Sequence, residues 1–123
     1  MFDNVYDVPI IPLVVIICLL ILGLVLYLIL KPKRVVEKYD TGEKRYVYHI
    51  KEGKRVGKET VFYRSGKKNK EKYYEQGVLN GRCITYYETG ARYIEAFYEN
   101  GKLKGEYKIY EEDGPIKEVR TYN

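Results

Sequence analysis

The sequence is poor in the residues that usually carry chemistry. It contains one histidine, two cysteines, one methionine and no tryptophan among 123 residues. The cysteines, Cys18 and Cys83, lack the spacing of metal ligands, and Cys18 lies in an apolar run where it cannot bridge to the other. No glycine-rich phosphate loop precedes a helix. We therefore predict no catalytic residue, no metal site and no cofactor, and a protein that is not an enzyme.

Charge is absent from one long stretch near the N-terminus. The 21 residues from Ile10 to Leu30 are uncharged, and as a helix they would span roughly 31 Å, close to the hydrocarbon thickness of a bilayer. A signal peptide is disfavoured, because residues 1–9 contain no Lys or Arg and no small residues suitable for cleavage follow the run. A buried core helix is disfavoured too, because the rest of the chain is too small to enclose it. We predict a single membrane-spanning helix.

Positive charge is missing before this helix and concentrated after it. Lys31, Lys33 and Arg34 follow its C-terminal end within a basic juxtamembrane linker, residues 31–35. The positive-inside rule then predicts a short extracytoplasmic N-terminus, residues 1–9, and a cytoplasmic domain, residues 36–123. The predicted location is the cell membrane, crossed once.

Glycine is nearly confined to one periodic pattern. Ten of the eleven glycines recur at intervals of 24 residues, and Gly23 is the exception. A fixed period of this length indicates a repeat architecture, in which each unit packs mainly on its neighbours. The ten structural repeat glycines are Gly42, Gly53, Gly57, Gly66, Gly77, Gly81, Gly90, Gly101, Gly105 and Gly114.

Each repeat reads as two strands and two turns. Small polar residues precede most of the turn glycines, where positive φ is favoured, and segments rich in Tyr, Val, Ile and Thr alternate with Lys and Glu between them. Gly57, Gly81 and Gly105 fall near strand starts, where they permit a bend or close packing against an aromatic ring. We expect successive antiparallel hairpins with strands near 35–39, 43–50, 55–63, 67–75, 79–87, 91–99, 103–111 and 116–122.

The repeat resembles the bacterial MORN-repeat variant, whose units carry Tyr-x-x-Gly-x-x-x-Gly. The matching segments are Tyr74–Gly81 and Tyr98–Gly105, and the first unit departs with Ile50 in place of tyrosine. The resemblance covers three and a half repeats in residues 36–123. It implies an all-β, single-layer antiparallel β-meander used for binding, and a role related to antitoxins of toxin–antitoxin pairs.

The repeat frame also explains the isolated polar residues. His49 is equivalent to Tyr73, Phe97 and Thr121, so it fills a mostly aromatic structural slot. Ser65, the only serine, is equivalent to turn-forming residues, and the acidic run at 111–113 leads into a turn glycine. We expect structural roles for all of them.

With no candidate for catalysis, the surface of the predicted sheet is the part of the protein that could carry function. Residues 31–123 contain 22 Lys and Arg against 15 Asp and Glu, a net charge of +7, which suits a solvated sheet surface, anionic lipid or an acidic protein. Nucleic acid is disfavoured, because the tyrosines fall on repeat positions that the fold explains. The predicted function is protein binding at the cytoplasmic face, with toxin neutralisation as one form; the alternatives are a scaffold on anionic lipid and an envelope protein facing outside. The aromatic residues that could form the binding surface are Phe62, Tyr74, Tyr86, Tyr98 and Tyr110.

Overall fold

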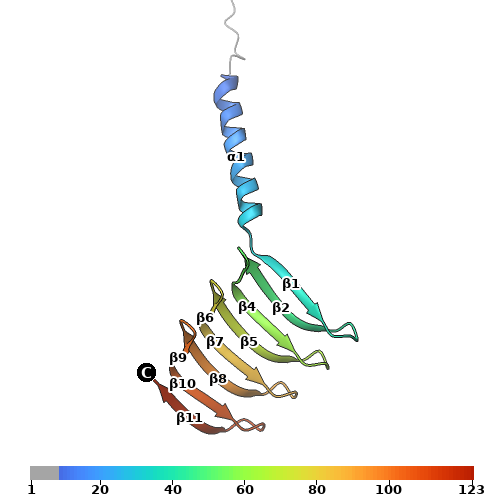
Figure 1. The fold of residues 1–123 in the computed structure, drawn as a ribbon, viewed down its shortest axis with the longest axis vertical. Helices are drawn as coiled ribbons and strands as arrows, with labels where there is room; N and C mark the ends of the chain where they lie inside the picture. Colours follow the sequence, from blue (N-terminus) through green and yellow to red (C-terminus); the bar gives the residue numbers. More distant parts are fainter. Residues whose placement is uncertain (1–8) are drawn as a thin grey trace, which may run out of the picture. The chain divides into compact units, whose positions relative to one another are not determined.

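The computed structural model describes residues 9–123, and the chain divides into two compact units, Met1–Lys31 and Pro32–Asn123. The first unit contains one helix, α1 (Ile10–Leu30), which is long and apolar enough to cross a membrane (Figure 1). None of its residues is buried. The predicted extracytoplasmic segment lies outside the described residues except for Pro9, which precedes the first helical residue.

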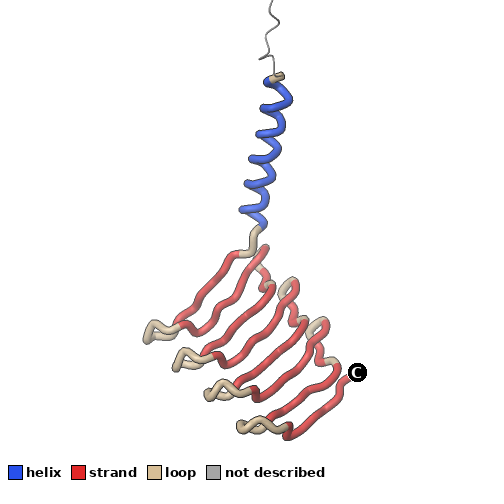
Figure 2. Tube along the Cα trace, turned by 180° about the vertical axis from the view of Figure 1, so that it is seen from behind, coloured by secondary structure: helices blue, strands red, loops and turns tan. Residues whose placement is uncertain are grey.

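The second unit is one open antiparallel sheet that follows the chain as a meander (Figures 1 and 2). The sheet has 11 strands, eight of which form its main path in the order β1-β2-β4-β5-β7-β8-β10-β11. This confirms the predicted fold class. The strands are β1 (Lys33–Lys38), β2 (Lys44–Lys51), β3 (Lys54–Arg55), β4 (Gly57–Phe62), β5 (Lys68–Glu75), β6 (Val78–Leu79), β7 (Gly81–Tyr86), β8 (Arg92–Glu99), β9 (Lys102–Leu103), β10 (Gly105–Tyr110) and β11 (Ile116–Tyr122).

The glycines take the turn geometry that their spacing predicts. All ten repeat glycines have positive φ. In three hairpins the residue before the glycine is also left-handed, which is the pattern of a type I′ turn and matches the twist of the flanking strands. These turns contain Glu52-Gly53, Gln76-Gly77 and Asn100-Gly101.

Three predicted strands are interrupted in the structure. Segments 55–63, 79–87 and 103–111 each divide into a two-residue strand and a longer one, because a glycine with φ between +70° and +119° bends the backbone at the junction. Each glycine is paired with a tyrosine on the next long strand. An added Cβ would lie 3.3 Å from Tyr73 Cβ at Gly81 but would meet nothing within 4 Å at Gly57 or Gly105, so positive φ is the shared reason for glycine. The pairs are Gly57–Tyr74, Gly81–Tyr98 and Gly105–Tyr122.

The linker between helix and sheet is shorter than the predicted 31–35. Strand β1 begins at Lys33, because Lys33 and Val35 already pair with Ile50 and Tyr48 of β2. Only Lys31 and Pro32 separate α1 from the sheet. The predicted first strand therefore starts two residues earlier than its composition suggested.

The sheet is a single layer with a thin core. Among residues 9–123 the buried side chains are few, and two of them are carboxylates. The remaining tyrosines and aliphatic residues are mostly half-buried, since each ring covers its neighbours on one side only. The buried residues are Tyr48, Ile84, Ala96, Glu59 and Glu71.

Successive units are fastened to each other at both ends of the strands. At one end a tyrosine hydroxyl donates a hydrogen bond to a backbone carbonyl of the next unit, a contact we term the tyrosine clasp. At the other end a turn glycine N–H donates to a carbonyl of the preceding unit, as in Gly77 to Arg55 and Gly101 to Leu79, both at 2.8 Å. The clasps are Tyr39 to Phe62 at 2.7 Å, Tyr63 to Tyr86 at 2.6 Å and Tyr87 to Tyr110 at 2.8 Å.

Candidate functional site: the two faces of the sheet

The sheet presents two faces, which the strand register defines. Directly paired residues share a face, and neighbours along a strand alternate between faces. One face carries Glu59 and Lys72, which are paired, and we name it the Glu59 face. The other carries Glu71 together with the paired residues Lys58 and Tyr73, and we name it the Glu71 face.

The structure does not gather the five predicted binding aromatics on one surface. Phe62, Tyr86 and Tyr110 lie on the Glu71 face, whereas Tyr74 and Tyr98 lie on the Glu59 face. All five are half-buried. They recur at the same repeat interval, but residues at different points of the repeat fall on opposite faces, so the set cannot act as a single surface.

On the Glu71 face, a buried carboxylate binds two cations and a tyrosine. The Glu71 carboxylate accepts contacts from Lys58 Nζ at 2.8 Å, Lys68 Nζ at 2.8 Å and the Tyr86 hydroxyl at 3.4 Å. Lys58 and Lys68 remain about half exposed at their outer sides. The carboxylate therefore fixes two cations in place without removing them from solvent.

The next unit repeats this arrangement 24 residues later. Glu95 accepts contacts from Arg82 and Arg92, each at 3.0 Å, and from the Tyr110 hydroxyl at 3.4 Å. The first unit omits it, because Val47 stands at the carboxylate position and Phe62, which lacks a hydroxyl, at the tyrosine position. Carboxylate and tyrosine hydroxyl thus occur together or not at all.

Both clusters stabilise the ionised carboxylate. Burial opposes ionisation of Glu71, but the hydrogen bonds from Lys58 and Lys68 outweigh it and lower the pKa of the carboxyl. The pKa of Glu95 is lowered in the same way, with Arg82 as its main partner. The pKa of Lys58 is raised, since its hydrogen bond to Glu71 outweighs its own burial. At neutral pH these groups are therefore charged.

The Glu59 face contains a different polar cluster, in the first unit only. Glu59 is 1% exposed, and its Oε1 accepts a 2.7 Å hydrogen bond from Arg55, whose guanidinium carbon lies 4.4 Å from the centre of the Tyr48 ring. Oε2 has no hydrogen-bond partner among the described residues, and Lys72 Nζ lies 3.7 Å away. The equivalent positions hold Cys83 and Tyr107, so the fold does not require a charge there.

The residues that could carry chemistry lie apart from one another. Burial raises the pKa of the Cys83 thiol, which keeps it protonated and a weak nucleophile. Ser65 is exposed in a turn, where its Oγ accepts a hydrogen bond from Lys67 N at 3.5 Å. Within residues 9–123, no three side chains of the metal-binding types come together.

The exposed aromatic residues of the sheet are Tyr73, Tyr93 and Phe97, and the sequence patterns singled out none of them as a binding residue. Tyr73 is 37% exposed and Phe97 is 46% exposed, and both lie on the Glu71 face. They occupy the slot of His49, which the repeat frame predicted to be structural. In the structure Tyr73 and Phe97 are exposed, because the single-layer sheet has no second layer to cover them, whereas His49 is half-buried. The signal that could have found them is their placement opposite basic residues.

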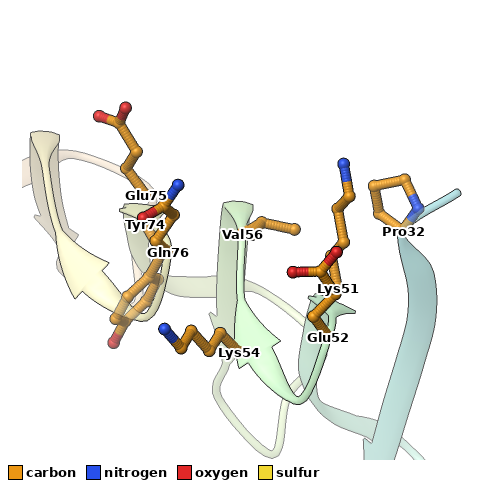
Figure 3. A pocket seen from close by; sticks show the side chains of 8 residues that line it. All are labelled: Pro32, Lys51, Glu52, Lys54, Val56, Tyr74, Glu75 and Gln76. Carbon is orange, nitrogen blue, oxygen red and sulfur yellow. The ribbon is translucent and has the colours of Figure 1, made fainter. Parts of the chain in front are cut away.

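One hollow opens at the end of the sheet where β1 begins. Its lining comes from Pro32, from the turn after β2 and from β5 with its turn (Figure 3). Lys51 and Lys54 are balanced there by Glu52 and Glu75, and no nucleophilic side chain lines it. The hollow is wide and open, and its balanced charges favour neither an anion nor a cation.

No family model, curated protein or solved structure matches the chain. The resemblance to the MORN-repeat variant therefore stays a prediction from the glycine–tyrosine motif.

Proposed function

We propose that this protein is a non-enzymatic binding module that α1 anchors in the membrane and whose sheet contacts a partner protein on the cytoplasmic side. The observation that supports the proposal is the exposure of Tyr73 and Phe97 on an open sheet face, where the carboxylates of Glu71 and Glu95 are engaged with neighbouring strands. Aromatic residues and arginine are enriched at the centres of protein interfaces, where they supply much of the affinity.

The uncharged helix supports the membrane anchor. The distribution of positive charge supports a cytoplasmic sheet. Lys31, Lys33 and Arg34 directly follow the span, and no Lys or Arg precedes it. The alternative is an envelope protein with the sheet outside the cell. A reporter that is active only in the cytoplasm, fused after Asn123, separates the two. Activity supports the proposed orientation, and inactivity of a stably produced fusion favours the envelope alternative.

The family resemblance adds toxin neutralisation as one form of this binding. A neutralising protein acts by covering a surface of the toxin, which requires a broad contact face and no catalytic group. Under this proposal, cells that produce a toxic protein from a neighbouring gene should grow again when they also produce this protein. Failure of the Tyr73→Ser/Phe97→Ser double variant to restore growth, at equal protein level, would connect the effect to the sheet.

The proposal separates binding from catalysis by substitution. His49→Phe should preserve activity, because the equivalent slot already holds Phe97, and Ser65→Thr should do the same, following Thr89. Tyr73→Ser/Phe97→Ser should abolish partner capture from solubilised membranes while circular dichroism shows an unchanged sheet. Loss of activity in His49→Phe or Ser65→Thr alone, in a folded protein, would refute the binding proposal.

A second candidate function, a scaffold on anionic lipid, is favoured by the uneven charge of the sheet. Residues 31–78 contain 15 Lys and Arg against 7 Asp and Glu, a net charge of +8, whereas residues 79–123 contain 7 against 8, a net charge of −1. The basic half is the one that directly follows the helix. Full-length protein in nanodiscs should then show protection of its lysines from acylation when phosphatidylglycerol is included, and the protection should disappear at high salt.

A further inference from the structure

Cations face aromatic rings in three equivalent cross-strand pairs on the Glu71 face. Each pair joins a basic residue on one strand to an aromatic residue directly opposite on the next, and the repeat places the pairs 24 residues apart. The six residues form what we name the cation–aromatic row. The pairs are Arg34–His49, Lys58–Tyr73 and Arg82–Phe97.

The row has a defined end and a defined spacing. The fourth equivalent pair is Glu106–Thr121, which has neither cation nor ring. Within the row, successive cations are two strands apart, or about 9.6 Å at the usual strand separation. A peptide in the extended polyproline II conformation has three residues per turn and rises about 3.1 Å per residue, so every third side chain returns to the same side after about 9.3 Å. Acidic side chains at every third position of such a peptide would therefore meet Arg34, Lys58 and Arg82 in turn.

The second and third cations of the row, Lys58 and Arg82, are held in fixed positions. Glu71 binds Lys58 and Glu95 binds Arg82, yet these cations keep 43% and 50% of their side-chain surface exposed. Attraction to a lipid surface depends on net charge, which the two carboxylates reduce. Recognition of discrete carboxylates depends on donors in fixed positions, and the contacts with Glu71 and Glu95 fix the donors Lys58 and Arg82. The arrangement therefore favours a protein segment over a lipid surface.

We propose that the cation–aromatic row binds an extended acidic segment of the partner protein, with carboxylates at every third position and apolar side chains packed on Tyr73 and Phe97. The proposal rests on the proposed function as a binding module and adds the face and the chemistry of the partner. The segment runs across the strands, so it contacts all three pairs at once.

A peptide experiment tests the spacing. The full-length protein is held in phosphatidylcholine nanodiscs, and fluorescence anisotropy measures binding of a labelled peptide that repeats Glu-Ser-Ile. A peptide of the same composition with its glutamates clustered is the control. We expect binding of the repeating peptide to be about tenfold tighter and to weaken about tenfold in Arg34→Gln. Lys33→Gln removes the same charge from the adjacent position on the opposite face, and it should leave the affinity unchanged. Equal affinity for both peptides, absence of binding, or equal effects of the two substitutions would overturn the proposal.

A crosslinking experiment in native membranes tests the face. A photoreactive phenylalanine replaces Phe97 on the Glu71 face or Tyr98 on the Glu59 face of the full-length protein. A protein crosslink at position 97 supports the inference if it is lost when the repeating Glu-Ser-Ile peptide is present during irradiation. A Gln-Ser-Ile peptide should leave the crosslink in place. A protein crosslinked only through position 98 would overturn the inference and leave the proposed function standing. Lipid crosslinked at position 97 with no protein would overturn it in favour of membrane contact, and absence of any protein crosslink at either position would count against the proposed function itself.

Discussion

Gly101→Ala is expected to destabilise the sheet through one turn. Gly101 has φ +82°, and a residue with a side chain loses about 1–2 kcal/mol in this left-handed region. The added Cβ would also lie 3.3 Å from Val78 Cγ1, so Val78 must move. Alanine also reduces the conformational freedom of the unfolded chain, which offsets about 0.4–1 kcal/mol of this loss. We expect a net loss of about 1–2 kcal/mol in the free energy of unfolding.

Gly77→Ala is the matched control, because it changes the equivalent turn without the close contact. Gly77 has φ +83°, and its added Cβ would meet Lys54 Cβ at 3.6 Å, an ordinary van der Waals distance. The backbone penalty is therefore the same, but no neighbour must move. We expect a smaller loss, of about 0.5–1 kcal/mol.

The measurement is urea unfolding of residues 32–123, followed by circular dichroism. At a slope of roughly 2 kcal/mol per molar urea, Gly101→Ala should lower the midpoint by about 0.5–1 M and Gly77→Ala by less. Equal midpoints for wild type and Gly101→Ala would show that this turn does not need a glycine. A larger effect at Gly77 would show that the contact with Val78 is not the source of the difference.

Other perturbations address the clasp, the carboxylate cluster, the turns and the anchor. Tyr63→Phe removes the hydroxyl that donates to the Tyr86 carbonyl and should cost about 1 kcal/mol in urea unfolding, and no change would show the clasp to be dispensable. Because the pKa of Glu71 is lowered in the folded state, its stabilisation is present above the unfolded pKa and is lost as pH falls through the folded value. Thermal melts from about pH 5 to about pH 3 should therefore show a shallower decline for Glu71→Gln than for wild type. Gln76→Asn should raise stability by a few tenths of a kcal/mol, about the gain from a residue that tolerates positive φ, and a lower urea midpoint would contradict this. Full-length protein should stay in the pellet after carbonate extraction of membranes, whereas release into the supernatant would contradict the anchor.

The repeat and its strands were readable from the sequence because glycine and tyrosine spacing reports backbone geometry directly. The turn at Gly101 needs positive φ, and no other residue type meets that need as well. The short strands β3, β6 and β9 were not separated from their neighbours, because the bend at Gly57 and its equivalents leaves the alternation of side chains intact. The bounds of the helix followed from Pro9, which directly precedes it, and from Lys31, the first charged residue after it.

The candidate surface was less accessible to sequence reasoning. Assigning Phe62 and Tyr74 to opposite faces requires the register of paired strands, and a bulge in each of the β1–β2, β4–β5, β7–β8 and β10–β11 hairpins changes that register by one residue. The Glu71 cluster could have been found by comparing units, because Val47 and Phe62 replace its carboxylate and tyrosine together. Partner and orientation stay predictions, because they depend on molecules outside the chain.

The exposed last strand gives the sheet a direction of unravelling. Strand β11 pairs only with β10 and is exposed along nearly its whole length, whereas β1, the other edge strand, is half-buried at Val35 and Val36. In an array whose units touch only their neighbours, local opening starts where the junctions are weakest. Amide hydrogens of β11 should therefore exchange with solvent first and those of β4 and β5 last. A protease acting on the opened state would digest the chain from the β11 side and leave the first units joined to the helix.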